Sequence, residues 1–295
     1  MLGDKRVSGA CDCHVHVVDP TDRFPQSAAR SYTADIAPLD SLRAFAEPEG
    51  VSRFVIVQAS FYGTDNSCLL EALGRLGENG RGVVAVDLNA MPPALLEQYE
   101  QRGVRGLRVN LYSKSLAFAA ERIGDLLAAA IEKTPSQGWH VEIIAPISLL
   151  LSAASTIAES RVPVVLDHYA LPAGASPDSP EGQRLLDLVA LPHVWVKLTA
   201  PYRIVADPWA THPPTGWLSA LLRTAPDRCV WGSDWPHTPL DRDQKGPSES
   251  APYRRIRYER LLGDFLAALP NQALAARILV DNPARLYGFP PTDCS

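Results

Sequence analysis

The sequence predicts an α/β protein whose strands close into a single-domain (β/α)₈ TIM barrel. Eight short runs rich in β-branched residues recur along the 295 residues, and a helical pattern separates each run from the next. Strands that alternate with helices pair in parallel through crossover connections. One barrel takes about 250 residues, and no linker or shift in composition divides the chain. We therefore expect one barrel domain, at residues 8–290.

The expected strands are Cys11–Val18, Arg53–Ala59, Gly82–Leu88, Val104–Leu111, His140–Ala145, Val162–Tyr169, Val194–Ala200 and Cys229–Trp235. The expected helices are Ser41–Ala46, Ser67–Leu76, Ala94–Gln101, Ile123–Lys133, Ser148–Glu159, Gly182–Val189 and Trp217–Arg223. A doubly wound open sheet is the main alternative. It is disfavoured because no glycine-rich phosphate loop follows the first strand.

The composition argues against several kinds of partner. A formal charge of -5 and a pI of about 5.8 provide no basic surface for nucleic acid or an anionic membrane. The first ten residues do not resemble a signal peptide, and no run of about 18 apolar residues predicts a membrane span. We expect a cytoplasmic protein. The sequence specifies no oligomeric state.

The five cysteines do not form a disulfide framework, because their number is odd and their spacing irregular. Cys11 and Cys13 lie beside two histidines and invite comparison with a zinc site. Side chains alternate along a strand, however, which places these cysteines on the face opposite the histidines. We expect them to be buried thiols that pack under the helices.

The first strand contains the H-x-H pattern of His14 and His16. Strand alternation directs both imidazoles to one face, near the end of the strand. Such a pair suits either metal binding or the stabilisation of negative charge. The alternative is a pair of hydrogen-bonded histidines in the core.

Two further strands end in polar groups. The sixth ends in Asp167 and His168, and the eighth carries Asp234 two residues after Gly232, which permits close approach of the backbone. Barrel enzymes keep their active sites at the carboxyl ends of the strands. Alone, Asp234 could be a helix N-cap or a salt-bridge partner. Together with three histidines at strand ends, it favours a catalytic site.

These motifs resemble the amidohydrolase superfamily, and within it the pyrone-dicarboxylate lactonase group. The resemblance covers nearly the whole chain, including Arg30–Thr33, Val57–Ser60, Gly106–Asn110, Val196–Arg203 and Asp281–Tyr287. It implies water-mediated opening of a small anionic lactone that carries a carboxylate. Two related activities stay open, a zinc-dependent decarboxylase (a lyase) and a lactone isomerase. A barrel that only binds a small acid is a third alternative.

The resemblance implies that Asp234 is the general base. It also implies that His14, His16 and His168 polarise the carbonyl and stabilise the oxyanion. The expected substrate-binding residues are Tyr32, Ser60, Arg108, Lys114 and Arg203, with His237 orienting the pocket or carrying a proton. Arginine suits this task because its planar guanidinium meets a carboxylate in a bidentate manner.

The chain departs from the lactonase pattern at two places. Ile144 stands where the lactonase has a tyrosine and the metal-dependent relatives a histidine. Leu171 stands where the lactonase has an arginine. Both changes put the dicarboxylate substrate in doubt.

We expect no cofactor. The alternative is one Zn²⁺ at His14, His16, His168 and Asp234, which are suitable ligand types for an open catalytic site. The fourth strand, however, offers Arg108 and Asn110 in place of the bridging lysine of two-metal relatives. Ile144 removes a second usual ligand, and an arginine near the site disfavours a dication.

Overall fold

The computed structural model describes residues 7–112, 122–240 and 243–290. Its main sheet has eight parallel strands in the order β1-β3-β4-β5-β6-β7-β8-β9. These are β1 Ala10–Val15, β3 Val51–Val57, β4 Gly80–Val84, β5 Val104–Asn110, β6 His140–Ile144, β7 Val164–Leu166, β8 Val194–Thr199 and β9 Cys229–Gly232. Each corresponds to a predicted strand, so the predicted fold class is confirmed.

The sheet closes where the last strand meets the first. The His16 N–H donates to the Trp235 carbonyl (2.8 Å), and the Asp234 N–H donates to the His14 carbonyl (2.9 Å). A parallel bridge between Val15 and Trp235 continues this contact. The closure brings the H-x-H strand directly beside the strand that carries Asp234.

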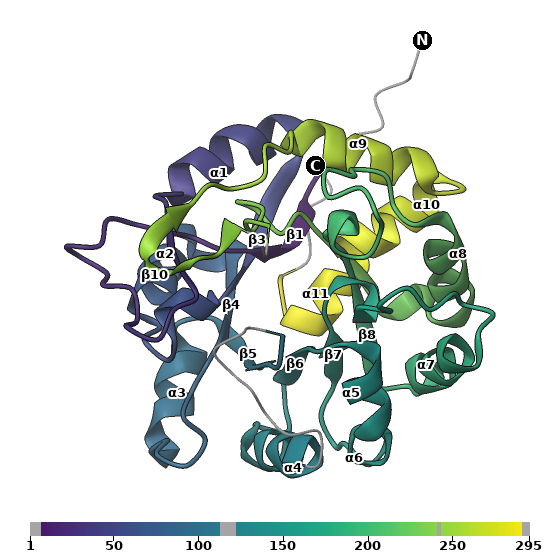
Figure 1. The fold of residues 1–295 in the computed structure, drawn as a ribbon, viewed down its shortest axis with the longest axis horizontal. Coiled ribbons are helices and arrows are strands. Elements are labelled where there is room, and N and C mark those ends of the chain that lie inside the picture. The colour runs from purple at the N-terminus through teal and green to yellow at the C-terminus, as the bar shows by residue number, and fades with distance from the viewer. Residues whose placement is uncertain (1–6, 113–121, 241–242, 291–295) are drawn as a thin grey trace.

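The described residues form eleven α-helices, and all but the last surround the barrel (Figure 1). They are α1 Leu39–Ala46, α2 Ser67–Leu76, α3 Pro93–Gln101, α4 Ile123–Lys133, α5 Ile147–Ser152, α6 Ala154–Ala158, α7 Pro180–Ala190, α8 Thr215–Thr224, α9 Tyr258–Ala268, α10 Gln272–Ala276 and α11 Asn282–Tyr287. The predicted helix at Ser148–Glu159 is two helices, α5 and α6, and α9 to α11 were not predicted. No helix among the described residues has the length and apolar character to span a membrane.

A small ribbon that the sequence did not predict lies at the carboxyl end of the barrel. β2 (Tyr32–Ala34) follows β1, and β10 (Gly246–Ala251) follows β9, and the two pair in parallel. The Gly246 N–H donates to the Ser31 carbonyl (3.0 Å). The segment after β1 and the segment after β9 are therefore joined, and this pairing holds Tyr32 at the mouth of the barrel.

The opposite end of the barrel is closed by the C-terminal segment, with α11 at the centre of the view in Figure 1. Arg81 of β4 donates from Nε to the Tyr287 carbonyl (3.0 Å). Asn282 donates from Nδ2 to the carbonyl of Cys229, the first residue of β9 (2.7 Å). Tyr287 and Phe289 belong to one cluster with valines from strands on opposite sides of the barrel, such as Val55 of β3 and Val165 of β7. This apolar cluster is therefore the floor of the barrel interior.

The predicted orientation of the two cysteines is wrong. Cys11 and Cys13 are fully buried, but they belong to the interior floor cluster and do not pack under the helices. The pairing of β1 with β3 shifts register between Asp12 and Val15. Such a bulge interrupts the simple alternation of side chains, so that Cys13 and His14 both point into the barrel. The four cysteines among the described residues are free thiols.

Candidate active site

The carboxyl ends of the strands surround a cavity of about 320 Å³. Seven of the predicted site residues line it, namely His16, Tyr32, Ser60, Arg108, His168, Arg203 and Asp234. His14 is fully buried directly beneath, with its Nε2 3.6 Å from Asp234 Oδ1. His237 is buried outside the lining, and Lys114 lies outside the described residues.

Asp234 is positioned by its backbone as much as by its side chain. Its φ of 59° lies in the left-handed region, which costs a non-glycine residue on the order of 1 kcal/mol or more. Hydrogen bonds from the Asp234 N–H to His14 and from the His237 N–H to Asp234 hold this conformation. At Gly232 a Cβ would stand 2.7 Å from the His14 backbone nitrogen, so the close approach expected there is required.

The two oxygens of the Asp234 carboxyl have different surroundings. Oδ2 accepts a hydrogen bond from the Tyr202 hydroxyl (2.8 Å) and one from Arg203 Nε (3.1 Å). Oδ1 has no hydrogen-bond partner among the described residues, although His16 Nε2 lies 3.4 Å away. Oδ2 is thus held by two hydrogen bonds, and Oδ1 lies near the Nε2 atoms of His14 and His16.

The charge of Asp234 is strongly favoured in the folded protein. Burial alone would raise the pKa of its carboxyl. The Arg203 guanidinium is the main opposing influence, and the pKa lies well below its ordinary value. Asp234 is therefore an ionised carboxylate at neutral pH.

Two histidines near Asp234, His14 and His168, favour the neutral form. Burial lowers the pKa of His14 and of His168 well below the ordinary value. His168 contacts Thr199 Oγ1 through Nδ1 (2.6 Å). It also begins a run of four residues with positive φ, ending at Leu171, so this histidine is held in a backbone conformation that L-residues rarely adopt.

Beneath the cavity lies a buried network of charges that the sequence analysis missed. Lys197 of β8 forms an ion pair with Glu142 of β6 (Nζ to Oε2, 2.5 Å) and lies 3.8 Å from Asp167. Arg108 reaches Asp167 from the cavity side (3.5 Å). Burial and Asp167 push the pKa of Glu142 upward, but Lys197 and nearby His140 outweigh them, and the pKa lies below its ordinary value.

Among the described residues, each carboxylate of this network and of the cavity has a cationic partner. Three carboxylates face three cations, namely Asp234, Asp167 and Glu142 against Lys197, Arg108 and Arg203. Charges are stable in a protein interior only when they are paired. The sequence does carry a signal for this network. Glu142 and Lys197 each stand within an otherwise apolar strand that is buried along its whole length, so neither side chain can reach solvent.

His237 and Leu171 are both buried and lie outside the residues that line the cavity. His237 packs edge-on against Tyr202 (ring centroids 6.1 Å apart), behind the residue that contacts Asp234. Burial lowers its pKa to about 4. Leu171 is buried and is not part of the cavity lining, so it does not replace a cation at the cavity wall. Ile144 does line the cavity.

Two groups of side chains have the spacing of a metal site among the described residues. One is His14, His16 and Asp234, and the other is His14, Asp167 and His168. In the first group His14 Nε2 and Asp234 Oδ1 have no hydrogen-bond partner. Ligand type and spacing there fit zinc, whereas Asp234 is already paired with Arg203 at 3.1 Å.

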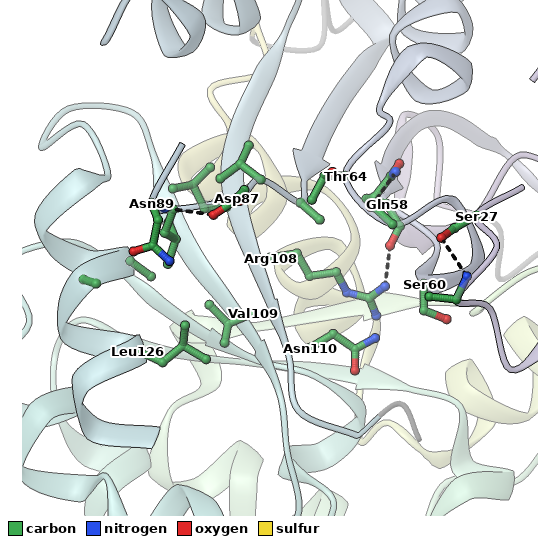
Figure 2. A pocket seen from close by; sticks show the side chains of 18 of the residues that line it. Ser27, Gln58, Ser60, Thr64, Asp87, Asn89, Arg108, Val109, Asn110 and Leu126 are labelled. Atoms are coloured by element: carbon green, nitrogen blue, oxygen red, sulfur yellow. Dashed lines mark hydrogen bonds between the residues drawn. The ribbon is translucent and has the colours of Figure 1, made fainter. Parts of the chain in front are cut away.

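A second cavity, of about 550 Å³, lies beside the first and is seen in Figure 2. The two share four lining residues, Ala59, Ser60, Arg108 and Asn110. In Figure 2 the Arg108 guanidinium points toward Gln58, to whose carbonyl Nη1 donates (2.5 Å). Asp234, His16 and His168 line only the smaller cavity, which is therefore the candidate site of chemistry.

The fold and the site together define a (β/α)₈-barrel protein with a carboxylate and histidines at the carboxyl ends of its strands. A family model described as amidohydrolase matches residues 11–289. The chain therefore belongs to this amidohydrolase family, and the resemblance predicted from the motifs is confirmed.

Several known proteins are similar over most of their length. A 4-sulfomuconolactone hydrolase of Rhizobium radiobacter is 32% identical over 288 residues, which cover 95% of this chain and 90% of that protein. A 2-pyrone-4,6-dicarboxylate hydrolase of Comamonas testosteroni is 31% identical over 294 residues, covering 96% and 91%. The crystal structure of a putative 2-pyrone-4,6-dicarboxylic acid hydrolase from Pseudomonas putida has a TM-score of 0.77 and 27% identity, covering 97% of this chain and 100% of that one.

Proposed function

We propose that this protein is a lactone hydrolase that opens the ring of a small anionic lactone by attack of water. The observation that carries the proposal is Asp234, a buried, ionised carboxylate at a cavity, with Oδ2 occupied by Tyr202 and Arg203 and Oδ1 without a hydrogen-bond partner. The 4-sulfomuconolactone and 2-pyrone-4,6-dicarboxylate hydrolases among its relatives support the same reaction class.

In this proposal Asp234 Oδ1 accepts a proton from water while the water oxygen forms a bond to the lactone carbonyl carbon. The negative charge passes to the carbonyl oxygen, where His14, His168 and the nearby cations stabilise it. The bond between the carbonyl carbon and the ring oxygen then breaks. Asp234 returns its proton to the departing oxygen, so that it is an ionised base again after each turnover.

The anionic group of the substrate binds at the cavity wall. The cavity is lined by two arginines, Arg108 and Arg203, and by Tyr32 and Ser60. Arg203 donates to Asp234 through Nε, and Arg108 Nε has no hydrogen-bond partner among the described residues, so both guanidinium groups keep N–H donors for a substrate carboxylate or sulfonate. The part assigned to Lys114 by the resemblance stays a prediction.

We propose that the reaction needs no metal ion. If zinc were bound, His14, His16 and Asp234 would hold it, and it would supply polarisation of the carbonyl. Two observations support the metal-free alternative. Asp234 is engaged by Arg203 at 3.1 Å, and the three buried carboxylates already have three cationic partners.

The test is turnover of a panel of lactones by the purified protein. The panel contains 4-sulfomuconolactone, 2-pyrone-4,6-dicarboxylate, and monocarboxylate and neutral lactones, each followed by the absorbance of the ring-opened product. We expect hydrolysis of at least one anionic lactone and none by Asp234→Asn. Failure to hydrolyse any member, with a folded protein, would count against the proposed function.

A further inference from the structure

His14 and His16 are adjacent on β1, but their Nδ1 atoms face partners of opposite kind. His14 Nδ1 lies 3.3 Å from Lys197 Nζ, in hydrogen-bonding geometry. An ammonium group has three donors and no lone pair, so it can only donate. His14 Nδ1 must accept, and the neutral imidazole then carries its single proton on Nε2.

His16 has the reverse arrangement. Its Nδ1 lies 2.8 Å from the Val57 carbonyl oxygen, which can only accept. His16 therefore donates from Nδ1, which in the neutral imidazole leaves the lone pair on Nε2. That Nε2 and His14 Nε2 lie 3.4 Å and 3.6 Å from the same oxygen, Asp234 Oδ1.

One neighbour could compete for His14. Asp167 Oδ1 also lies 3.3 Å from His14 Nδ1 and could accept a proton from it, but that contact does not have hydrogen-bonding geometry. A proton on Nδ1 would also point at the Lys197 ammonium, which Glu142 holds in place at 2.5 Å. Both Lys197 and Glu142 are fully buried, so bulk solvent does not screen that repulsion.

We infer that Lys197 is a positioning residue that holds His14 in the Nε2–H tautomer, opposite to that of His16, so that a donor and an acceptor flank Asp234 Oδ1. His14 then contributes an N–H to the negative charge at the reaction centre. His16 accepts a hydrogen bond from the attacking water, which replaces the oxyanion-stabilising part given to it above. This chemical consequence rests on the proposed function, whereas the tautomers do not.

The assignment has a consequence for metal binding. A histidine ligates through a nitrogen lone pair, and the Nε2–H tautomer offers none at the atom that faces His16 and Asp234. Lys197 thus removes one of the three ligand atoms whose spacing would otherwise suit zinc. A buried ammonium makes the site a hydrogen-bonding centre, although its residues are of the types that bind metal.

The first experiment measures the tautomers in the free enzyme. Long-range ¹H–¹⁵N correlation spectra of the uniformly ¹⁵N-labelled full chain distinguish protonated from unprotonated ring nitrogens, and the chain has only seven histidines to assign. The signals of His14 and His16 are identified by their loss in His14→Asn and His16→Asn. We expect the proton of His14 on Nε2 and that of His16 on Nδ1. A proton on His14 Nδ1 overturns the inference, whatever substrates the enzyme accepts.

The second experiment replaces the ion pair by apolar side chains of similar size, Lys197→Met with Glu142→Leu. Such replacement of a whole buried pair is often neutral for stability, whereas removal of one partner is costly. His14 Nδ1 is then left facing Asp167, so the proton should move to Nδ1 and Nε2 should become a ligand. We expect zinc affinity, measured by competition with a chromophoric chelator, to rise roughly 10- to 100-fold.

The same double variant should lose roughly 10²- to 10³-fold in kcat, the usual cost of one donor to a developing oxyanion. The matched control is Val83→Ala, which removes buried volume from the floor cluster but leaves the ion pair intact. The control should keep the His14 tautomer and the zinc affinity of the wild type. An unchanged tautomer and an unchanged zinc affinity in the double variant would refute the role of Lys197.

Discussion

The low pKa of Asp234 depends on Arg203, and this dependence can be measured. In Arg203→Met the guanidinium that donates to Oδ2 at 3.1 Å is lost, while the surrounding burial stays. Burial raises the pKa of a carboxyl, and an opposite charge at this range lowers it by about 1–3 units. The pKa of Asp234 should therefore rise by about that amount in the variant.

The rise in the pKa of Asp234 should shift the pH dependence of the rate. The base form of Asp234 is the carboxylate, so activity is lost as pH falls through its pKa. In the wild type this acid limb of kcat/KM lies well below the ordinary aspartate range. In Arg203→Met it should move up by about 1–3 pH units.

The assay is the pH profile of kcat/KM for the wild type, Arg203→Met and Arg203→Lys, with folding at each pH checked by circular dichroism. Lysine restores a positive charge without the planar fork, so its acid limb should lie between the other two. If the acid limb of Arg203→Met coincides with that of the wild type, Asp234 is not the titrating base or Arg203 does not set its pKa.

Four further outcomes are expected. Asp234→Asn should lose about 10²- to 10⁴-fold in kcat with an unchanged melting temperature, and near-wild-type turnover would refute the general base. Activity should survive exhaustive chelation, with less than one metal ion per chain by mass spectrometry; recovery only on adding zinc would contradict this. Burial lowers the pKa of His237 to about 4 from 6.5, so the unfolded state binds its proton first as pH falls. The free energy of unfolding should therefore decrease between about pH 6.5 and 4, by up to about 1.4 kcal/mol per unit from this group, less steeply in His237→Asn. Leu171→Arg should not improve turnover of dicarboxylate lactones, since Leu171 lies outside the cavity lining; a gain would show that the side chain at 171 can reach the substrate.

The sequence alone determined the barrel and placed the proposed acid–base groups at the carboxyl ends of its strands. Local patterns suffice for this, because β-branched runs define strands and a fixed hand of crossover places every carboxyl end on one side. His16, His168 and Asp234 are separated by up to 218 positions in the sequence, but each follows or ends a strand, and the closed sheet brings them to one cavity. Their chemistry could be anticipated from the residue types.

Tertiary structure alone decided the surroundings of those groups. A bulge in β1 turned Cys13 toward the interior, and its register depends on the neighbouring strand β3. The ribbon of β2 and β10 forms from two excursions that are short and polar, and therefore lack a pattern of their own. Long-range contacts of this kind leave no local signal in a single sequence.

The clearest case is the ion pair of Glu142 and Lys197. Each residue is visible in its strand, but the sequence does not show that β6 and β8 present them to the same point of the interior, 2.5 Å apart and beneath His14. Residue type determined that His14 could be a ligand, a donor or an acceptor. Which of the three it is depends on the partner of its Nδ1, and that partner, 183 positions away, is brought there only by closure of the barrel.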